Sequence, residues 1–125
     1  RRAIDNIMTR LRSLVEETGA GLILVSHLRR VDGNKGHENG IEVSLSHLRG
    51  SNSIGQLSDC VIALERNQQS DDPEEARTTK LRVLKSRYTG DVGMATSLIY
   101  DKETGRLSEH FDTEFNSEED SLTAF

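Results

Sequence analysis

An imidazole and two guanidinium groups follow an apolar run of four residues in this sequence. The run Leu22–Val25 is typical of a buried strand, and it leads through Ser26 to His27, Arg29 and Arg30. A side chain at the carboxyl end of a parallel strand faces the crevice where open α/β sheets bind ligands. The imidazole of His27 can donate a hydrogen bond to a phosphate oxygen there. The alternative is a structural histidine whose hydrogen bonds are satisfied within the fold.

A second pair of cations stands in the stretch "LKSRYTGDVG". Lys85 and Arg87 are two residues apart, so on a strand they point to the same face. Two cations beside glycine turns form a candidate phosphate clamp, and arginine suits the charge that develops on a transferring phosphoryl group. An ordinary solvated edge strand is the alternative interpretation.

Residues 29–47 combine glycine with basic side chains in one long connecting segment. Loops of this length inside a compact domain are usually functional or disordered. Cations spaced by glycine can follow a nucleic-acid phosphate backbone, and the candidates for this role are Arg29, Arg30, Lys35 and His37. Base stacking is not expected, because the chain has three Phe, two Tyr and no Trp. A mobile surface loop without a ligand is the alternative.

The string "LRGS" after this loop is a weaker candidate for phosphate contact. Arg49 and Gly50 precede an expected short helix that contains Gln56, and the first backbone N–H groups of a helix can bind an anion. Asp59 and Glu65 bracket the next apolar stretch. We interpret these two acids as caps or surface charges rather than catalytic groups.

Apolar periodicity indicates the elements that position these residues. Apolar side chains three and four residues apart predict an amphipathic helix over residues 3–18. A helix that feeds an apolar strand is typical of an α/β fold with a parallel-type sheet flanked by helices. The other expected elements are strands at 22–26, 60–66 and 79–88, a short helix capped by Ser51 or Ser53, a polar loop at 67–77, and a hairpin of 94–101 with 105–111.

The acidic charge is concentrated at the C-terminal end. Six of the 21 acidic residues lie from position 109 onward without any Lys or Arg, which leaves 15 acidic against 16 basic residues in the body. We therefore predict a near-neutral domain portion at 1–111, which does not exclude a nucleic-acid partner, and a disordered acidic tail at 112–125. Cys60 is the single cysteine, and a buried free thiol suits a reducing cytoplasm.

Several familiar signals are absent from the sequence. There is no G-x-x-x-x-G-K-[ST] string to cradle nucleotide phosphates. There is also no C-x-x-C pair, no metal-type histidine spacing and no apolar run near the ~18 residues of a membrane span. We assign no metal ligands and expect no membrane partner. Because Arg1 already stands inside a helical pattern, we expect the chain to be a piece of a longer protein.

Several strings in a fixed order carry a resemblance to a known family. They are "ILVSHLRR", the glycine-rich basic loop, "HLRGSNSIGQLSD", "VIALERNQQ", "LKSRYTGDVG" and "YDKETGRL". In this order they resemble the C-terminal part of hexameric DnaB-like replicative DNA helicases, closest to the bifunctional primase–helicases of short-tailed, T-odd-type phages. The resemblance implies the C-terminal portion of a RecA-like ATPase core, acting in the cytoplasm of a host cell.

The resemblance also implies roles for individual residues. His27 matches a sensor of the nucleotide γ-phosphate, and Arg87 matches an arginine finger that reaches ATP on the neighbouring subunit. Lys85 matches a position near the same phosphates. The implied DNA-binding residues are Arg29, Arg30, Lys35, Arg49, Gly50 and Gln56. The implied contacts with a replicative DNA polymerase are Glu118, Glu119, Asp120 and Phe125 in the tail.

The implied activity is ATP-dependent translocation in the 5′-to-3′ direction on single-stranded DNA by a ring of six or seven identical subunits. The implied cofactor is ATP or dTTP with Mg²⁺, and the chain alone is expected to be inactive because it lacks the phosphate-binding loop. Gly33 and Gly55 depart from the family, since relatives can carry a basic residue at both positions. A RecA-like DNA-binding, recombinase or regulatory module without unwinding activity stays open, as does a non-catalytic polymerase-binding fragment.

Overall fold

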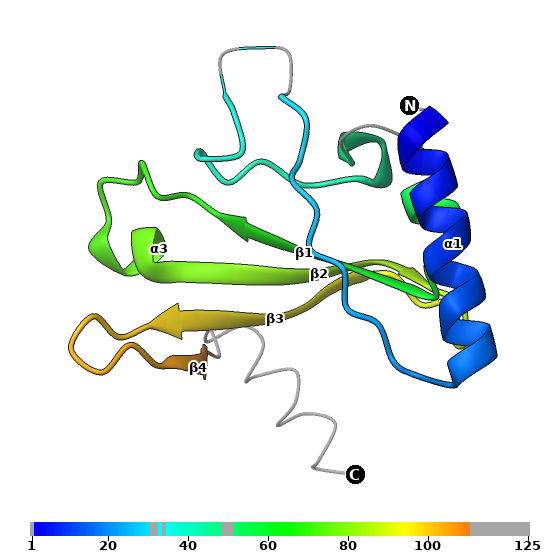
Figure 1. The fold of residues 1–125 in the computed structure, drawn as a ribbon. Helices are drawn as coiled ribbons and strands as arrows, with labels where there is room; N and C mark the ends of the chain where they lie inside the picture. The colour runs from blue at the N-terminus through cyan, green and yellow to red at the C-terminus, as the bar shows by residue number, and fades with distance from the viewer. Residues whose placement is uncertain (1, 31–32, 34, 49–51, 111–125) are drawn as a thin grey trace, which may run out of the picture.

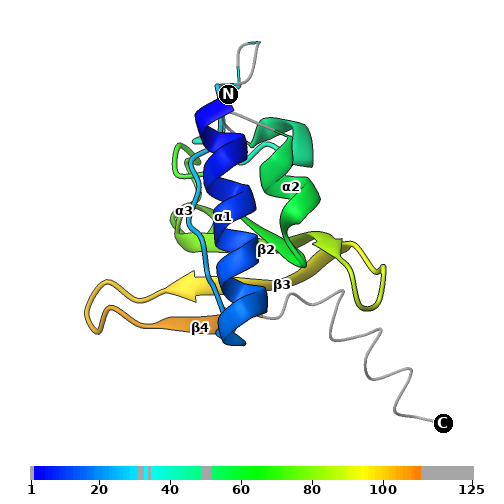
Figure 2. The same cartoon turned by 45° about the vertical axis from the view of Figure 1, so that its right-hand side comes forward.

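The computed structural model describes residues 2–30, 33, 35–48 and 52–110 (Figure 1). Its elements, in chain order, are α1 (Arg2–Thr18), the 3-10 helix η1 (Leu45–His47), α2 (Ser53–Leu57), β1 (Cys60–Arg66), α3 (Pro73–Arg77), β2 (Thr78–Ser86), β3 (Gly93–Tyr100) and β4 (Leu107–His110). The strands form one sheet, with α1 at one end and α3 at the other (Figure 1). Figure 2 shows α1 and α2 side by side. None of the described helices is long and apolar enough to span a membrane.

The sheet is antiparallel throughout. The strand order is β1-β2-β3-β4, and each strand runs opposite to its neighbour. The predicted α/β class and C-terminal hairpin are confirmed, whereas the predicted parallel-type sheet is wrong for the described part of the chain. The reason lies in the short connections 67–77, 87–92 and 101–106, because a parallel pair needs a crossover of about a dozen residues or more.

The segment 22–26, predicted as a buried strand, forms no strand in the structure. It has no regular secondary structure, and Ile23 and Val25 are 94% and 88% exposed. A strand needs a neighbour to pair its backbone N–H and C=O groups. Among the described strands none pairs with this segment, since β1 pairs only with β2. The prediction failed because the apolar run has no partner strand here.

The amphipathic helix predicted for residues 3–18 is confirmed as α1. Its apolar face is only partly covered, because Met8 is buried while Ile7 and Leu14 are more than half exposed. The helix ends where Gly19 takes a left-handed conformation with φ 70°, which glycine adopts without a steric penalty. The uncovered apolar positions show that this helix is not fully packed within the described residues.

Two short helices flank the sheet. The N-cap residue of α2 is Asn52, which lies between the two serines proposed for that role. The helix α3 replaces part of the predicted polar loop at 67–77. Its signal is present in the sequence, because Pro73 occupies the first turn and the Asp72 side chain accepts a hydrogen bond from the Glu74 N–H at 3.0 Å.

The strand β1 is buried on one face only, which corrects the prediction of a fully buried strand. Ala63 and Glu65 are buried, whereas Ile62 and Leu64 are 56% and 61% exposed. Because successive residues point to opposite faces of a sheet, the open face carries the even-numbered residues. Cys60 belongs to this exposed set, so the expectation of a buried thiol is also wrong.

A buried carboxylate holds the end of the long loop against the sheet. Glu65 is 4% exposed, and its Oε2 accepts hydrogen bonds from the Val43 N–H (2.8 Å) and from Arg82 Nε (2.7 Å). Arg82 Nη1 also lies 3.6 Å from an oxygen of Glu42. Glu65 is therefore not the cap or surface charge predicted from the sequence. It links β1, β2 and the loop.

Replacing Glu65 by alanine is expected to lower the free energy of unfolding by about 3 kcal/mol, because Arg82 loses its buried partner and the Val43 N–H loses its acceptor. Urea denaturation measures the change. The matched control is Glu42→Ala, which removes the other carboxylate at the same arginine. Since the Glu42 side chain is 74% exposed, its loss should change the free energy by less than about 1 kcal/mol. Equal effects of the two substitutions would contradict the role given to Glu65.

Candidate functional site

One of the cations predicted to bind phosphate, Arg87, lies against a carboxylate. Asp59 directly precedes β1 and Arg87 directly follows β2, and the pairing of Cys60 with Ser86 brings these two residues together. The Arg87 N–H donates to the Asp59 carbonyl at 2.8 Å. In addition, Arg87 Nη1 forms a close ion pair with Asp59 Oδ1 at 2.6 Å. The antiparallel register therefore anchors Arg87 through both its backbone and its side chain.

A second arginine holds the other oxygen of the same carboxylate. Arg12 of α1 donates from Nη1 to Asp59 Oδ2 at 2.9 Å. This hydrogen bond is the largest cause of a lowered Asp59 pKa, below the ordinary 3.8; burial opposes the shift, while the charges of Arg12, Arg87 and Lys85 reinforce it. Asp59 is thus an ionised link between α1 and the ends of β1 and β2. It is not the cap or surface charge predicted from the sequence.

Lys85 lies at the C-terminal turn of α2. Its Nζ donates to the carbonyl oxygens of Gly55 (2.8 Å) and Gln56 (3.1 Å), groups that a helix leaves unpaired at its end. The adjoining open depression has a volume of about 380 Å³ and is lined by Leu45, Ser46, Leu48, Asn52, Gly55, Gln56 and Lys85. The structure therefore joins Lys85 to Gln56, although the sequence analysis assigned them to different ligands.

The remaining predicted cations are exposed. His27 lies in a segment without regular secondary structure, and Arg30 and Lys35 are also on the surface. Within the described part of the chain, no hydrogen bond or ion pair joins the His27 ring to Lys85 or Arg87. The structure thus brings Lys85 and Arg87 close to Asp59 but does not bring His27 into contact with them.

The segment 28–48 contains the glycine-rich basic loop, and we call it the 28–48 loop. Its base is closed by hydrogen bonds and by a β-bridge between Leu28 and Leu48. The Arg29 N–H donates to the carbonyl of His47 at 2.8 Å, and Arg29 Nε donates to the carbonyl of Ser46 at 2.7 Å. Gly40 takes φ 76°, and a Cβ there would lie 2.8 Å from the Asn67 Cβ. A glycine is required where the loop passes β1. Part of the Arg29 guanidinium is therefore committed to the loop, and part remains for a ligand.

A histidine pair inside the loop was not found from the sequence. The rings of His37 and His47 meet edge to face with centroids 5.3 Å apart. His47 Nδ1 accepts a hydrogen bond from the Ser44 N–H at 3.2 Å. Burial is the main cause of a His47 pKa below the ordinary 6.5, and the charges of His37 and Arg29 add to it. Because this shift disfavours the protonated ring, the loop should weaken as pH falls from 6.5 through the lowered pKa.

Some predicted site residues lie outside the described residues. These are Arg49, Gly50, Glu118, Glu119, Asp120 and Phe125. Within the described ranges, no group of three or more His, Cys, Asp or Glu side chains is arranged to hold a metal ion.

Most of the chain matches one protein family. Residues 1–109 match the DnaB-like helicase C terminal domain. The chain belongs to this family. It is also 46% identical over 107 residues to the DNA helicase/primase of Enterobacteria phage T3, a match that covers 86% of this chain and 18% of the phage protein. The chain therefore spans less than a fifth of the length of that relative, and the family resemblance seen in the sequence is confirmed.

Replacing His37 by glutamine in this helicase-family chain is expected to raise the pKa of His47 towards 6.5, because the charge of the His37 ring is one of the causes that lower it. NMR titration of the His47 ring measures the shift. The control is His27→Gln, since His27 is not among the groups that lower this pKa. A His47 pKa that stays the same after the His37 substitution would show that the two rings are not coupled.

Proposed function

We propose that this chain is part of an ATP-dependent replicative DNA helicase, a ring of six or seven subunits that moves 5′-to-3′ along single-stranded DNA. The match of residues 1–109 to the DnaB-like helicase family carries the proposal. The phage T3 relative is named a DNA helicase/primase, which supports a role in phage DNA replication. We propose that the parent protein acts in the cytoplasm of the host. ATP or dTTP is the proposed nucleotide.

In this proposal Arg87 is an arginine finger for the nucleotide on a neighbouring subunit. Hydrolysis transfers the γ-phosphoryl group to water, and negative charge on its oxygens is stabilised by cations in the transition state. The Arg87 side chain is 44% exposed, and Nη1 is its paired nitrogen among the described contacts. The other N–H donors of the guanidinium are therefore available to phosphate oxygens, which supports the assignment.

The other nucleotide-facing roles go to His27 and Lys85. The exposed His27 ring is suited to sense the γ-phosphate, because it can donate a hydrogen bond to it. Lys85 acts near the same phosphates, either by its charge or after releasing the carbonyls of Gly55 and Gln56. Mg²⁺ would supply further charge neutralisation, but the described residues offer it no carboxylate cluster. We propose that the chain alone does not hydrolyse nucleotide, since its sequence lacks a phosphate-binding loop.

The 28–48 loop and the residues after it are the proposed DNA contact. The supporting observation is the exposure of Arg29, Arg30 and Lys35 on a loop whose base is fixed by hydrogen bonds. Arg49, Gly50 and Gln56 complete the proposed set. Cations on a fixed loop can follow a phosphate backbone without reading bases.

Two further proposals concern the longer protein. Leu22–Val25 would pair with another strand there, as part of a RecA-like core, which its exposed apolar side chains support. The acidic tail, with Glu118, Glu119, Asp120 and Phe125, would bind a replicative DNA polymerase. This second proposal is supported by the sequence pattern alone.

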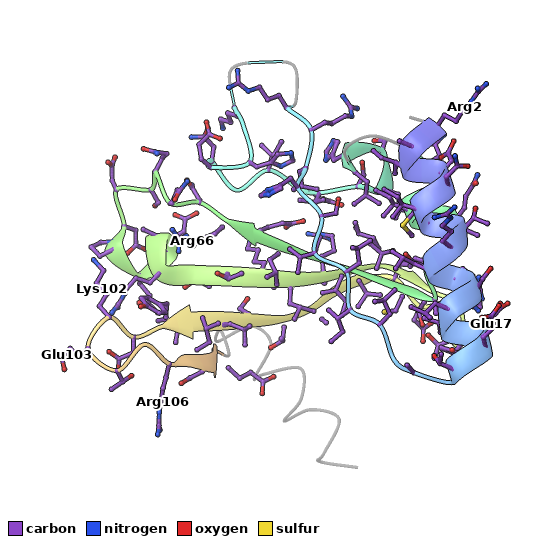
Figure 3. All side chains as sticks on the ribbon, in the orientation of Figure 1. Arg2, Glu17, Arg66, Lys102, Glu103 and Arg106 are labelled. Atoms are coloured by element: carbon purple, nitrogen blue, oxygen red, sulfur yellow. The ribbon has the colours of Figure 1, made fainter. Side chains whose placement is uncertain are left out.

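Replacing Arg87 by alanine in the ring protein is expected to lower DNA-stimulated nucleotide hydrolysis by at least about a thousandfold, because the finger's charge is lost from the transition state. Steady-state phosphate release measures the rate. Arg106→Ala is the matched control, since Arg106 lies just before β4 at the far end of the sheet from α1 (Figure 3). A similar rate for the two variants would exclude Arg87 as the finger.

Replacing Lys35 by alanine is expected to make the salt dependence of single-stranded DNA affinity less steep. One phosphate contact contributes about 0.7 to the log–log slope on a single strand, so the slope should fall by about that amount. Fluorescence anisotropy at several salt concentrations gives the slope for the ring protein. Lys102→Ala, in the turn between β3 and β4 (Figure 3), should leave it unchanged. An unaltered slope for the Lys35 variant would remove Lys35 from the DNA contact.

A further inference from the structure

We propose that Asp59 is a positioning residue that holds the guanidinium of Arg87 in the orientation used at the neighbouring nucleotide. The inference rests on the proposed role of Arg87 and adds to it the residue through which that role is set. It is carried by the two contacts from Arg87 to Asp59, one from the backbone N–H and one from Nη1. The backbone contact is a hydrogen bond, whereas the head-group contact is an ion pair in which Asp59 Oδ1 makes no hydrogen bond.

The carboxylate that holds Arg87 is itself held in place. Arg12 donates a hydrogen bond to Oδ2 while Arg87 forms an ion pair with Oδ1, so the carboxylate lies between two arginines. Arg12 is also tied to Glu16 one turn further along α1, at 3.1 Å. The orientation of Arg87 is therefore fixed relative to the long helix as well as to the sheet.

The solvent exposure of the three side chains in this network is consistent with the positioning role. The side chains of Arg12 and Asp59 are 26% and 30% exposed, and that of Arg87 is 44% exposed. Solvent exposure therefore increases from Arg12 on the helix, through Asp59, to Arg87. Arg87 contacts Asp59 through Nη1, so its other guanidinium N–H groups can donate to a phosphate. An arginine with all its donors paired could not do this. Preorganised donors are effective because they need no rearrangement during the reaction.

Loss of Asp59 should reduce turnover rather than nucleotide affinity. Without its anchor the Arg87 side chain regains rotamer freedom, and refixing it in the transition state should lower kcat by about 10- to 30-fold. The KM for nucleotide should change little, because the finger acts on the charge of the transition state. The predicted loss is smaller than that for Arg87→Ala, since the guanidinium itself is still present.

The test compares Asp59→Asn, Arg87→Ala and the double variant in the assembled ring protein that carries this chain. We expect Asp59→Asn to lower kcat alone and to have no further effect in the Arg87→Ala background, because it acts through Arg87. Asp101→Asn is the matched control. Asp101 also carries a lowered pKa, caused mainly by its hydrogen bond from the Glu103 N–H, and it lies in the β3–β4 turn.

The outcomes separate the two assignments. An unchanged rate for Arg87→Ala would remove the finger itself. A reduced rate for Arg87→Ala with a normal or faster rate for Asp59→Asn would overturn the positioning role. Equal losses from Asp59→Asn in both backgrounds would also overturn it, because they indicate a structural effect. If Asp59→Asn fails to fold by circular dichroism, Arg12→Gln is used, with an expected loss of about threefold that again disappears without Arg87.

Discussion

The antiparallel pairing of β1 with β2 is the constraint on which two ionic centres depend. One centre surrounds Asp59 and the other surrounds Glu65. Cys60 opposite Ser86 sets the residues just outside the strands, Asp59 and Arg87, beside each other. Further along, the same ladder brings Glu65 within reach of Arg82. A shift of one residue in pairing would turn every side chain to the other face of the sheet. Both centres would then lose their partners together.

The hydrogen-bond ladder between β1 and β2 contains a β-bulge. Val61 pairs with Lys85 but Ile62 pairs with Val83, so Leu84 is an extra residue on β2. A bulge of this kind bends the strand and redirects the side chains beyond it. Sequence spacing alone put Lys85 and Arg87 on one face of a strand, whereas the structure ends β2 before Arg87. Arg87 instead pairs with Asp59, while Lys85 Nζ donates to the carbonyl oxygens of Gly55 and Gln56 at the end of α2.

The sequence predicted the elements better than the contacts. The helical periodicity of α1 and the alternation of the strands are local sequence patterns, so these elements could be predicted from the sequence. The segment 22–26 has the same apolar character as β1, but its state depends on a partner strand that no local pattern reveals. Asp59 and Glu65 were misinterpreted for a related reason, since a carboxylate's environment is set by arginines 17 to 47 residues away. The helix α3 is different, because it has a local signal in the capping residue Asp72 and in Pro73 at its first turn.

The two ionic centres stand at opposite ends of one strand. Asp59 precedes β1 and Glu65 lies near its end, about 20 Å apart at the rise of an extended strand. Asp59 holds the proposed finger, while Glu65 accepts the Val43 N–H at the end of the proposed DNA loop. The proposed DNA loop and the proposed finger are therefore both held by carboxylates of one stretch of chain, Asp59 just before β1 and Glu65 within it.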